Sequence, residues 1–139
     1  MEKIVVRVLD FTEAPGPRFI NQGKHSGEQF YVDVLNGKMA QCIIENKDMD
    51  VLLDGTAGYP SSFLDQAFGE LVYDFTKAVV EHRVHIVTVI NRRRKNKLEN
   101  ETYPQWEIKR KNSPLLKHEI QEYELYFIDT DGELKQRKR

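Results

Sequence analysis

The sequence predicts an α/β protein, in which helices pack on a mixed β-sheet and a β-rich C-terminal extension follows. Two observations carry this prediction. The stretch 51–80 begins with a short apolar run, turns at Asp54-Gly55, and continues as an amphipathic helix. A second apolar run, 84–90, follows that helix directly. Strand, helix and strand in this order form a βαβ unit, whose strands are expected to be parallel with a right-handed crossover.

The segment before this unit predicts a strand and then a helix. Residues 3–11 are rich in β-branched side chains, which favour a strand, and residues 18–23 are compatible with a second, short one. Ser26 begins a capping-box pattern with Gln29, and apolar residues follow at helical spacing. Gly37 lies within this pattern and is expected to divide the helix, because glycine costs roughly 1 kcal/mol there relative to alanine.

The helix of the βαβ unit is predicted over residues 62–80. Ser61 and Ser62 stand where an N-cap belongs, and Ser62-x-x-Asp65 has the form of a capping box. Behind them, apolar residues recur every three or four positions, which indicates one face of a helix of about five turns. These residues are Leu64, Phe68, Leu71, Phe75, Ala78 and Val79.

The C-terminal third differs from the rest in charge. Residues 1–91 hold 8 Lys and Arg against 13 Asp and Glu, whereas residues 92–139 hold 13 against 9. Residues 91–100 predict a polar loop, and 105–111 an edge strand, because Trp106 and Ile108 alternate with charged residues. Residues 115–128 fit a helix or a strand. The turn signal at 129–132 favours a hairpin over about 123–136, with residues 137–139 frayed. We therefore expect a core, 1–91, and a basic extension, 92–139, packed on the same domain.

Composition excludes several classes of protein. The chain has 139 residues, of which 40% are hydrophobic, which suits one globular domain. Cys42 is the single cysteine, so no intrachain disulfide and no cysteine-based zinc site can form. No apolar run approaches about 18 residues, so we expect no membrane span and a cytoplasmic location. We also expect no enzyme, cofactor or metal site, because no nucleophile–base pairing, P-loop or metal spacing is present.

The first candidate site is the loop and helix start at 54–62. Ser61 and Ser62 lie where free N–H groups and the helix dipole favour an anion, including a phosphate on a serine. The alternative is that both serines only cap the helix. Asp54 and Tyr59 border the same loop and complete a partner-binding candidate. Asp54 could hold a metal or a proton, or it could cap the loop amides.

Two further groups carry charge. One combines a guanidinium, a hydroxyl, helix-start amides and a carboxylate, which suits binding of an anion or a partner's backbone: Arg18, Ser26, Gly27 and Glu28. Its alternative is a conformational lock, in which Arg18 pairs with Glu28 or with a central acidic residue. The other group is the basic run Arg92, Arg93, Arg94 and Lys95, with Lys97, which could contact nucleic-acid phosphates. Most such runs are solvated loops.

Together these segments resemble the STAS-like domain family of unknown function, found in bacteria and in phage-related loci. The resemblance covers about residues 4–90. Pro17 and Gln66 depart from the family pattern. The matching residues are Pro15-Gly16-x-Arg18, Gly23 and Ser26-Gly27-Glu28-x-Phe30, then Leu53-Asp54-Gly55-Thr56-x-Gly58-Tyr59 and Ser61-Ser62-Phe63-Leu64-Asp65-x-Ala67-Phe68-Gly69-x-Leu71.

The resemblance implies a STAS-like sheet and a regulatory protein. In anti-sigma-factor antagonists, a serine at the start of the helix after a central strand is phosphorylated by a partner ATPase of the histidine-kinase-like fold. That position falls on Ser62, with Ser61 beside it, which implies a kinase-like partner that docks on helix 62–80 and its preceding loop. Two alternatives stay open: a sensor of a small anion or nucleotide, and a nucleic-acid-binding accessory protein. An exposed edge strand leaves a homodimer open as well.

Overall fold

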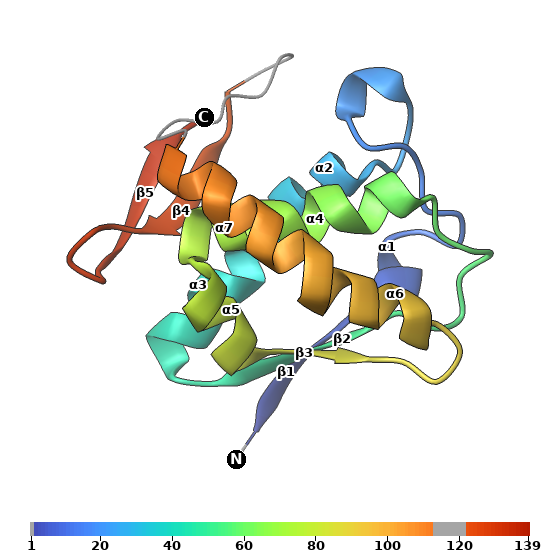
Figure 1. Cartoon of the computed structure of the whole chain (residues 1–139), viewed down its shortest axis with the longest axis horizontal. Coiled ribbons are helices and arrows are strands. Elements are labelled where there is room, and N and C mark those ends of the chain that lie inside the picture. The colour runs from blue at the N-terminus through green and yellow to red at the C-terminus, as the bar shows by residue number, and fades with distance from the viewer. Residues whose placement is uncertain (1, 113–121) are drawn as a thin grey trace.

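Three parallel strands and a separate hairpin make up the β structure of the computed structural model, which describes residues 2–112 and 122–139 (Figure 1). The parallel sheet has the order β1-β2-β3, and β4 pairs with β5 in an antiparallel hairpin. The α/β class is confirmed, with the parallel and antiparallel strands in two sheets rather than in one mixed sheet. The strands are β1 Lys3–Arg7, β2 Asp48–Leu52, β3 Val84–Val87, β4 Glu124–Ile128 and β5 Leu134–Lys138.

Helices connect the strands and cover one side of the parallel sheet (Figure 1). Residues 27–45 and 92–112 each form a nearly continuous helical run, and each run contains a π-helical turn, η2 or η3. The helical elements are α1 Val8–Phe11, η1 Ile20–Gln22, α2 Gly27–Phe30, η2 Tyr31–Leu35, α3 Asn36–Glu45, α4 Ser61–Phe75, α5 Lys77–Arg83, α6 Arg92–Lys97, η3 Leu98–Thr102 and α7 Tyr103–Asn112.

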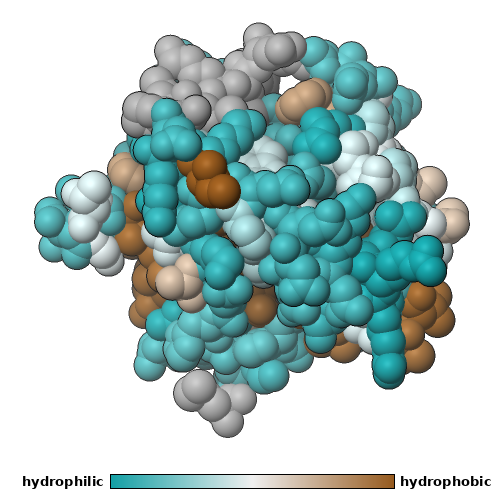
Figure 2. Space-filling model, in the orientation of Figure 1, coloured by the Kyte–Doolittle hydropathy of each residue, from teal (hydrophilic) through white to brown (hydrophobic). Residues whose placement is uncertain are grey.

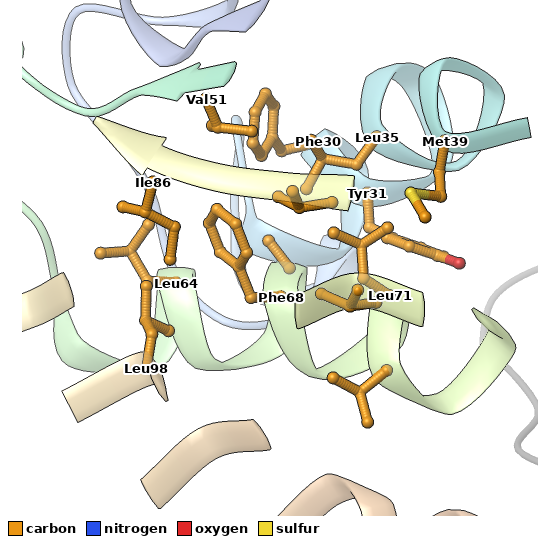
Figure 3. Packing of buried hydrophobic residues seen from close by; sticks show 14 of the residues in the cluster. Phe30, Tyr31, Leu35, Met39, Val51, Leu64, Phe68, Leu71, Ile86 and Leu98 are labelled. Carbon is orange, nitrogen blue, oxygen red and sulfur yellow. The ribbon is translucent and has the colours of Figure 1, made fainter. Parts of the chain in front are cut away.

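The core lies between the parallel sheet and these helices. Alternate strand residues point to the same face of a sheet, and the buried set here includes Val6, Val51 and Ile86. Figure 3 shows Val51 and Ile86 directed toward α4 and toward the helical run 27–45. The labelled residues are Phe30, Tyr31, Leu35 and Met39 in that run, and Leu64, Phe68 and Leu71 in α4. This packing fixes α4 at the centre of the molecule.

The predicted βαβ unit is confirmed, but its single helix is not. The prediction of one helix over 62–80 is wrong, because α4 ends at Phe75 and Thr76 adopts a positive φ of 74° before α5 begins. The Thr76 side chain then accepts a hydrogen bond from the Val79 amide and caps α5. The apolar periodicity runs through the break because both helices pack on the same core.

Three smaller expectations in the N-terminal half also need correction. The first strand ends at Arg7, where α1 begins, and the segment expected as a short strand contains the 3₁₀ turn η1. Gly37 lies inside α3 and does not interrupt the helical run. The helix after Ser26 is confirmed, with Ser26 as its N-cap.

The C-terminal extension is more helical than predicted. The expected loop at 91–100 contains α6 and η3, and the expected edge strand at 105–111 lies in α7. Trp106 packs on Gly69 of α4, where an added Cβ would lie 2.1 Å from the indole ring, and this contact requires the glycine. The predicted hairpin is confirmed by β4 and β5, and residues 115–121 lie outside the described part. Arg139, expected to fray, is buried. Across the described residues, no helix is long and apolar enough to span a membrane.

Candidate functional site

A pocket of about 310 Å³ lies at the N-terminal end of α4. Its walls come from four segments: the loop before η1, the first turn of α4, α6, and the junction of η3 with α7. The fold thereby joins Arg18, Ser61 and part of the basic run, which are three separate candidates in the sequence. The lining residues are Arg18, Ser61, Leu64, Asp65, Arg94, Lys97, Leu98, Glu101, Thr102 and Gln105.

Arg18 forms one wall of the pocket and is held by α4. Its guanidinium donates to Asp65 Oδ2 at 2.8 Å and to Gln66 Oε1 at 3.0 Å. The arginine and the aspartate stay 30% and 27% exposed, so this ion pair is open to solvent and to a ligand. Arg18 is therefore held in an ion pair, as in the alternative of a conformational lock, and its acidic partner is Asp65 in place of Glu28.

The two serines begin α4, but neither serves as its N-cap. Pro60 occupies that position, without a side-chain hydrogen bond. The expected capping box is not formed, because Asp65 instead accepts hydrogen bonds from Thr102 Oγ1 at 2.9 Å and from Trp106 Nε1 at 3.4 Å. Ser61 is exposed and lines the pocket, and Ser62 is half-buried beside it. Both hydroxyls thus stand at the positive end of a 15-residue helix.

The basic run supplies two more cations to the pocket. Arg94 and Lys97 line it from α6, and within the described residues neither forms an ion pair. Arg92 and Arg93 are exposed and lie outside the pocket lining, so the run is divided between the pocket and the solvent. Figure 2 shows the resulting hydrophilic surface over α6 and α7. The lining holds three cations, Arg18, Arg94 and Lys97, against two carboxylates, Asp65 and Glu101, so the pocket has a small excess of positive charge.

The π-helical turn η3 was not foreseen, and it shapes the pocket wall. Pro104 lies two residues after its end and has no N–H to continue the α-helical hydrogen-bond ladder. Such turns are rare and often lie at functional sites. The buried residues of this helical run, Leu98, Thr102 and Trp106, recur at a spacing of four, which is typical of a helix. The pattern is hard to recognise in the sequence because its middle member is a threonine, which is not strongly apolar.

Asp54 and Tyr59 make hydrogen bonds within the fold. Asp54 accepts hydrogen bonds from Thr88 Oγ1 at 2.5 Å, from the Val89 amide at 2.6 Å and from Asn91 Nδ2 at 3.0 Å, and so it holds the loop that leads into α6. Partial burial raises the pKa of Asp54, but these hydrogen bonds outweigh that effect and lower it. Tyr59 is buried, with its hydroxyl donating to Leu53 O at 2.6 Å. Burial raises the pKa of Tyr59 to about 12.

Ser26, Gly27 and Glu28, called the Ser26 group below, also make contacts within the fold at the start of α2. Ser26 Oγ accepts from the Gln29 amide at 3.0 Å, and Glu28 Oε1 accepts from the Ile20 amide at 2.8 Å. Gly27 lies against the backbone of Phe63, where an added Cβ would meet the carbonyl oxygen at 2.2 Å. These three residues are buried and outside the pocket lining, so of the predicted anion-binding group only Arg18 reaches the pocket.

A buried charge cluster lies at the other end of α4. The Arg139 guanidinium donates to Asp74 Oδ2 at 2.5 Å and lies 3.2 Å from Glu70 Oε1, and all three side chains are fully buried. The Tyr31 hydroxyl also donates to Asp74. Gln66 connects the two ends of the helix, because its Nε2 donates to Glu70 at 3.1 Å while its Oε1 accepts from Arg18.

The protonation of this cluster is set mainly by burial. Burial raises the pKa of Asp74 and outweighs the opposing effect of the Arg139 charge, which Asp74 shares with the buried Glu70. Arg137 Nη2 also lies 3.5 Å from Asp74 Oδ1. Burial and the nearby Asp74 also raise the pKa of Tyr31 well above its ordinary value. Across the described residues no cluster of His, Cys, Asp and Glu suits a metal ion. The residues of α4 from Gln66 to Phe75 are buried, so the exposed part of this helix is its first turn. Docking of a partner on the helix stays a prediction.

A comparison with protein families matched residues 26–91 to a STAS-like domain of unknown function. That segment runs from the N-cap of α2, through β2 and α4, to the loop after β3, and it holds Ser61 and Ser62 but neither Arg18 nor the pocket cations of α6. The predicted family is confirmed over this segment. Comparisons with curated proteins and with solved structures found no match.

Proposed function

We propose that this chain, whose residues 26–91 form a STAS-like domain, is a non-enzymatic regulatory module switched by negative charge at the start of α4. One observation carries the proposal: the exposed Ser61 shares a pocket with the cations Arg18, Arg94 and Lys97. The helix dipole at the start of α4 and three cations, against the carboxylates of Asp65 and Glu101, favour an anion at this place.

The anion in the favoured mechanism is a phosphate on Ser61 or Ser62. A partner kinase, such as a histidine-kinase-like ATPase, binds the first turn of α4. The serine oxygen attacks the γ-phosphorus of ATP, the bond to the β-phosphate oxygen breaks, ADP leaves, and the hydroxyl proton passes to solvent. The phosphate brings about −1.5 to −2 charges. It competes with Asp65 for Arg18, and the change in the exposed pocket wall alters how the partner docks.

A small anionic ligand in the same pocket is the second candidate. The pocket volume lies at the lower end of the range for small-molecule sites, roughly 300–1,000 Å³. Such a sensor would use Arg18 together with Arg94 and Lys97, in place of the Ser26 group. Nucleic-acid binding through Arg92–Lys97 stays a prediction, and a steep salt dependence of binding would support it.

Mass spectrometry after incubation with a histidine-kinase-like ATPase and ATP tests the first mechanism. We expect a phosphate on Ser61 or Ser62 and its loss in the double variant Ser61→Ala/Ser62→Ala. The phosphomimetic Ser61→Asp should change the affinity for the ATPase. Absence of the phosphate, or binding that is indifferent to Ser61→Asp, Ser61→Ala, Ser62→Asp and Ser62→Ala, would count against the switch.

Thermal shift with inorganic phosphate and with nucleotides tests the sensor. A ligand that binds only the folded state raises the melting temperature by mass action. We expect Arg94→Ala/Lys97→Ala to abolish the shift and Ser61→Ala to preserve it. Arg92→Ala/Arg93→Ala is the matched control, because it removes the same charge from the same helix outside the pocket lining. Equal loss in both double variants would indicate unspecific attraction.

A further inference from the structure

The parallel sheet has one face that the described elements leave open. In Figure 1 the described helices lie on one side of the sheet. On the other face, Val5 is 51% and Val87 is 43% exposed, and Leu52 is half-buried. Parallel sheets occur almost only with both faces covered, because their backbones are joined by crossover helices. An open face on such a sheet therefore indicates a surface that something else covers.

The open face is apolar toward the carboxyl ends of its strands, whereas its middle row is Val5, Asp50 and His85. Most of its charges are paired within it. The strand register places Leu52 beside Val87, with Val5 on the diagonal. Asp50 pairs with Lys3 at 3.3 Å, and Asp48 with His85 at 3.0 Å. Arg7, beside Leu52 on β1, forms no ion pair within the described residues. Beyond the carboxyl ends of the strands stand three further exposed apolar residues, Leu9, Val89 and Ile90.

We propose that this open face docks an amphipathic helix of a partner protein, with a carboxylate at the border of its apolar stripe. Three strands span two inter-strand spacings, about 10 Å, which matches the diameter of one α-helix, about 10–12 Å. Helices are also the elements that cover the faces of α/β sheets. The charge requirement follows from Arg7, which offers a guanidinium beside Leu52 and Val87 and has no acid of its own.

A second copy of this chain suits the face less well. Two copies stacked face to face on a two-fold axis would place β2 against β2. With the axis along β2, the carboxylates of Asp48 and Asp50 would then meet the same carboxylates of the other copy. Antiparallel pairing of two β1 edges centred on Val5 would set Lys3 opposite Arg7, and like charges directly opposite are destabilising. The docking helix does not depend on the pocket, because α4 lies against the opposite face of the sheet.

Binding of a synthetic helical peptide to the full chain tests this proposal. The probe has a leucine and alanine stripe bordered by glutamates, and the matched probe carries lysines in their place. We expect the glutamate peptide to shift the methyl NMR signals of Val5, Leu52 and Val87 and to bind roughly tenfold or more tightly than the lysine peptide. Arg7→Glu should reverse this preference. Absence of binding, or shifts confined to other methyl groups, would overturn the proposal.

Two substitutions locate the bound peptide. Val87→Glu, or Val5→Glu should the first fail to fold, is expected to weaken binding of the glutamate peptide by roughly tenfold or more. Ile108→Glu is the matched control, because Ile108 is 61% exposed on α7, away from the sheet, and should leave the affinity unchanged. Equal effects of the two substitutions would contradict the proposal. Sedimentation that shows a dimer dissociated by Val87→Glu would assign the face to a second copy and overturn the helix.

Discussion

The two ends of α4 use the same chemistry in opposite environments. At its start, Arg18 pairs with Asp65 at 2.8 Å, with about a third of each side chain exposed. Near its end, Arg139 pairs with Asp74 at 2.5 Å and with Glu70 at 3.2 Å, with no exposure at all. Both arginines reach α4 from distant segments, and Gln66 and Glu70 join the two sites by a hydrogen bond.

Exposure decides what each arginine can do. A solvent-exposed ion pair contributes about 0–1 kcal/mol, so a phosphate can draw Arg18 away from Asp65 at little cost. A buried pair is different, because removal of one partner leaves an uncompensated charge and costs about 3–5 kcal/mol. The start of α4 is therefore suited to exchange partners, and the buried cluster is suited to hold the hairpin β4–β5 on the helix.

The largest effect is expected from Arg139→Met. Methionine keeps much of the volume but leaves Glu70 without the Arg139 cation and Asp74 with only Arg137, 3.5 Å away, and we expect the free energy of unfolding to fall by about 3–5 kcal/mol at neutral pH. Urea unfolding measures it. The loss should shrink in acid, where the carboxyl groups are protonated. Arg94→Met is the control on the pocket side and should change stability by less than about 0.5 kcal/mol. Equal losses would refute the distinction between the two ends.

A smaller effect on the free energy of unfolding is expected from a change of pH. The sign of this effect differs between Asp74 in the buried cluster and Asp54 in the loop before α6. The folded-state pKa of Asp74 is raised above its ordinary value of 3.8. Its contribution to stability is therefore fully present below that ordinary value and is lost as pH rises through the folded pKa. Asp54, whose pKa is lowered, behaves in the opposite way, and its contribution is lost as pH falls below the ordinary carboxyl range.

Urea unfolding from acidic to neutral pH measures how the free energy of unfolding declines with pH on the acid side and on the neutral side. Asp74→Asn should flatten the decline above the ordinary carboxyl value, and Asp54→Asn should flatten the decline on the acid side. A wild-type curve whose upper slope is the same in the Asp74→Asn variant would show that Asp74 is ionised in the folded state throughout.

The smallest effect is expected from Arg18→Met, the same substitution at the open end. We expect stability to fall by about 1 kcal/mol: Asp65 keeps Thr102 and Trp106 as donors and is partly solvated, whereas the buried Gln66 Oε1 loses the hydrogen bond from Arg18. Thermal unfolding gives the value, and added salt should reduce it. A loss comparable to that of Arg139→Met would mean that the Arg18 pair is structural, and the exchange of partners at Ser61 would lose its basis.

Local patterns predicted the parts of the fold that depend on neighbours in sequence. The apolar runs gave β2 and β3, the Ser26 cap gave α2, and the turn signal at 129–132 gave the hairpin. The helices over residues 92–112 were missed because few of their residues are buried, and one of those is threonine. The alternation of Trp106 and Ile108 misled because Trp106 packs on Gly69 while Ile108 faces solvent, a contact that no local pattern contains.

By itself, the sequence determined the βαβ core and the serines at the start of its helix. Spacing within one element is enough for both, since helix and strand periodicity are local properties. Only the tertiary structure decided which charges meet. It placed Arg18 and Arg94 beside Ser61 and buried Arg139 against Asp74. It also directed the Asp54 carboxylate to the amides of the loop before α6. The physical reason is that the strength and the role of a charge depend on its burial and its partners, and both are set by packing between segments far apart in the chain.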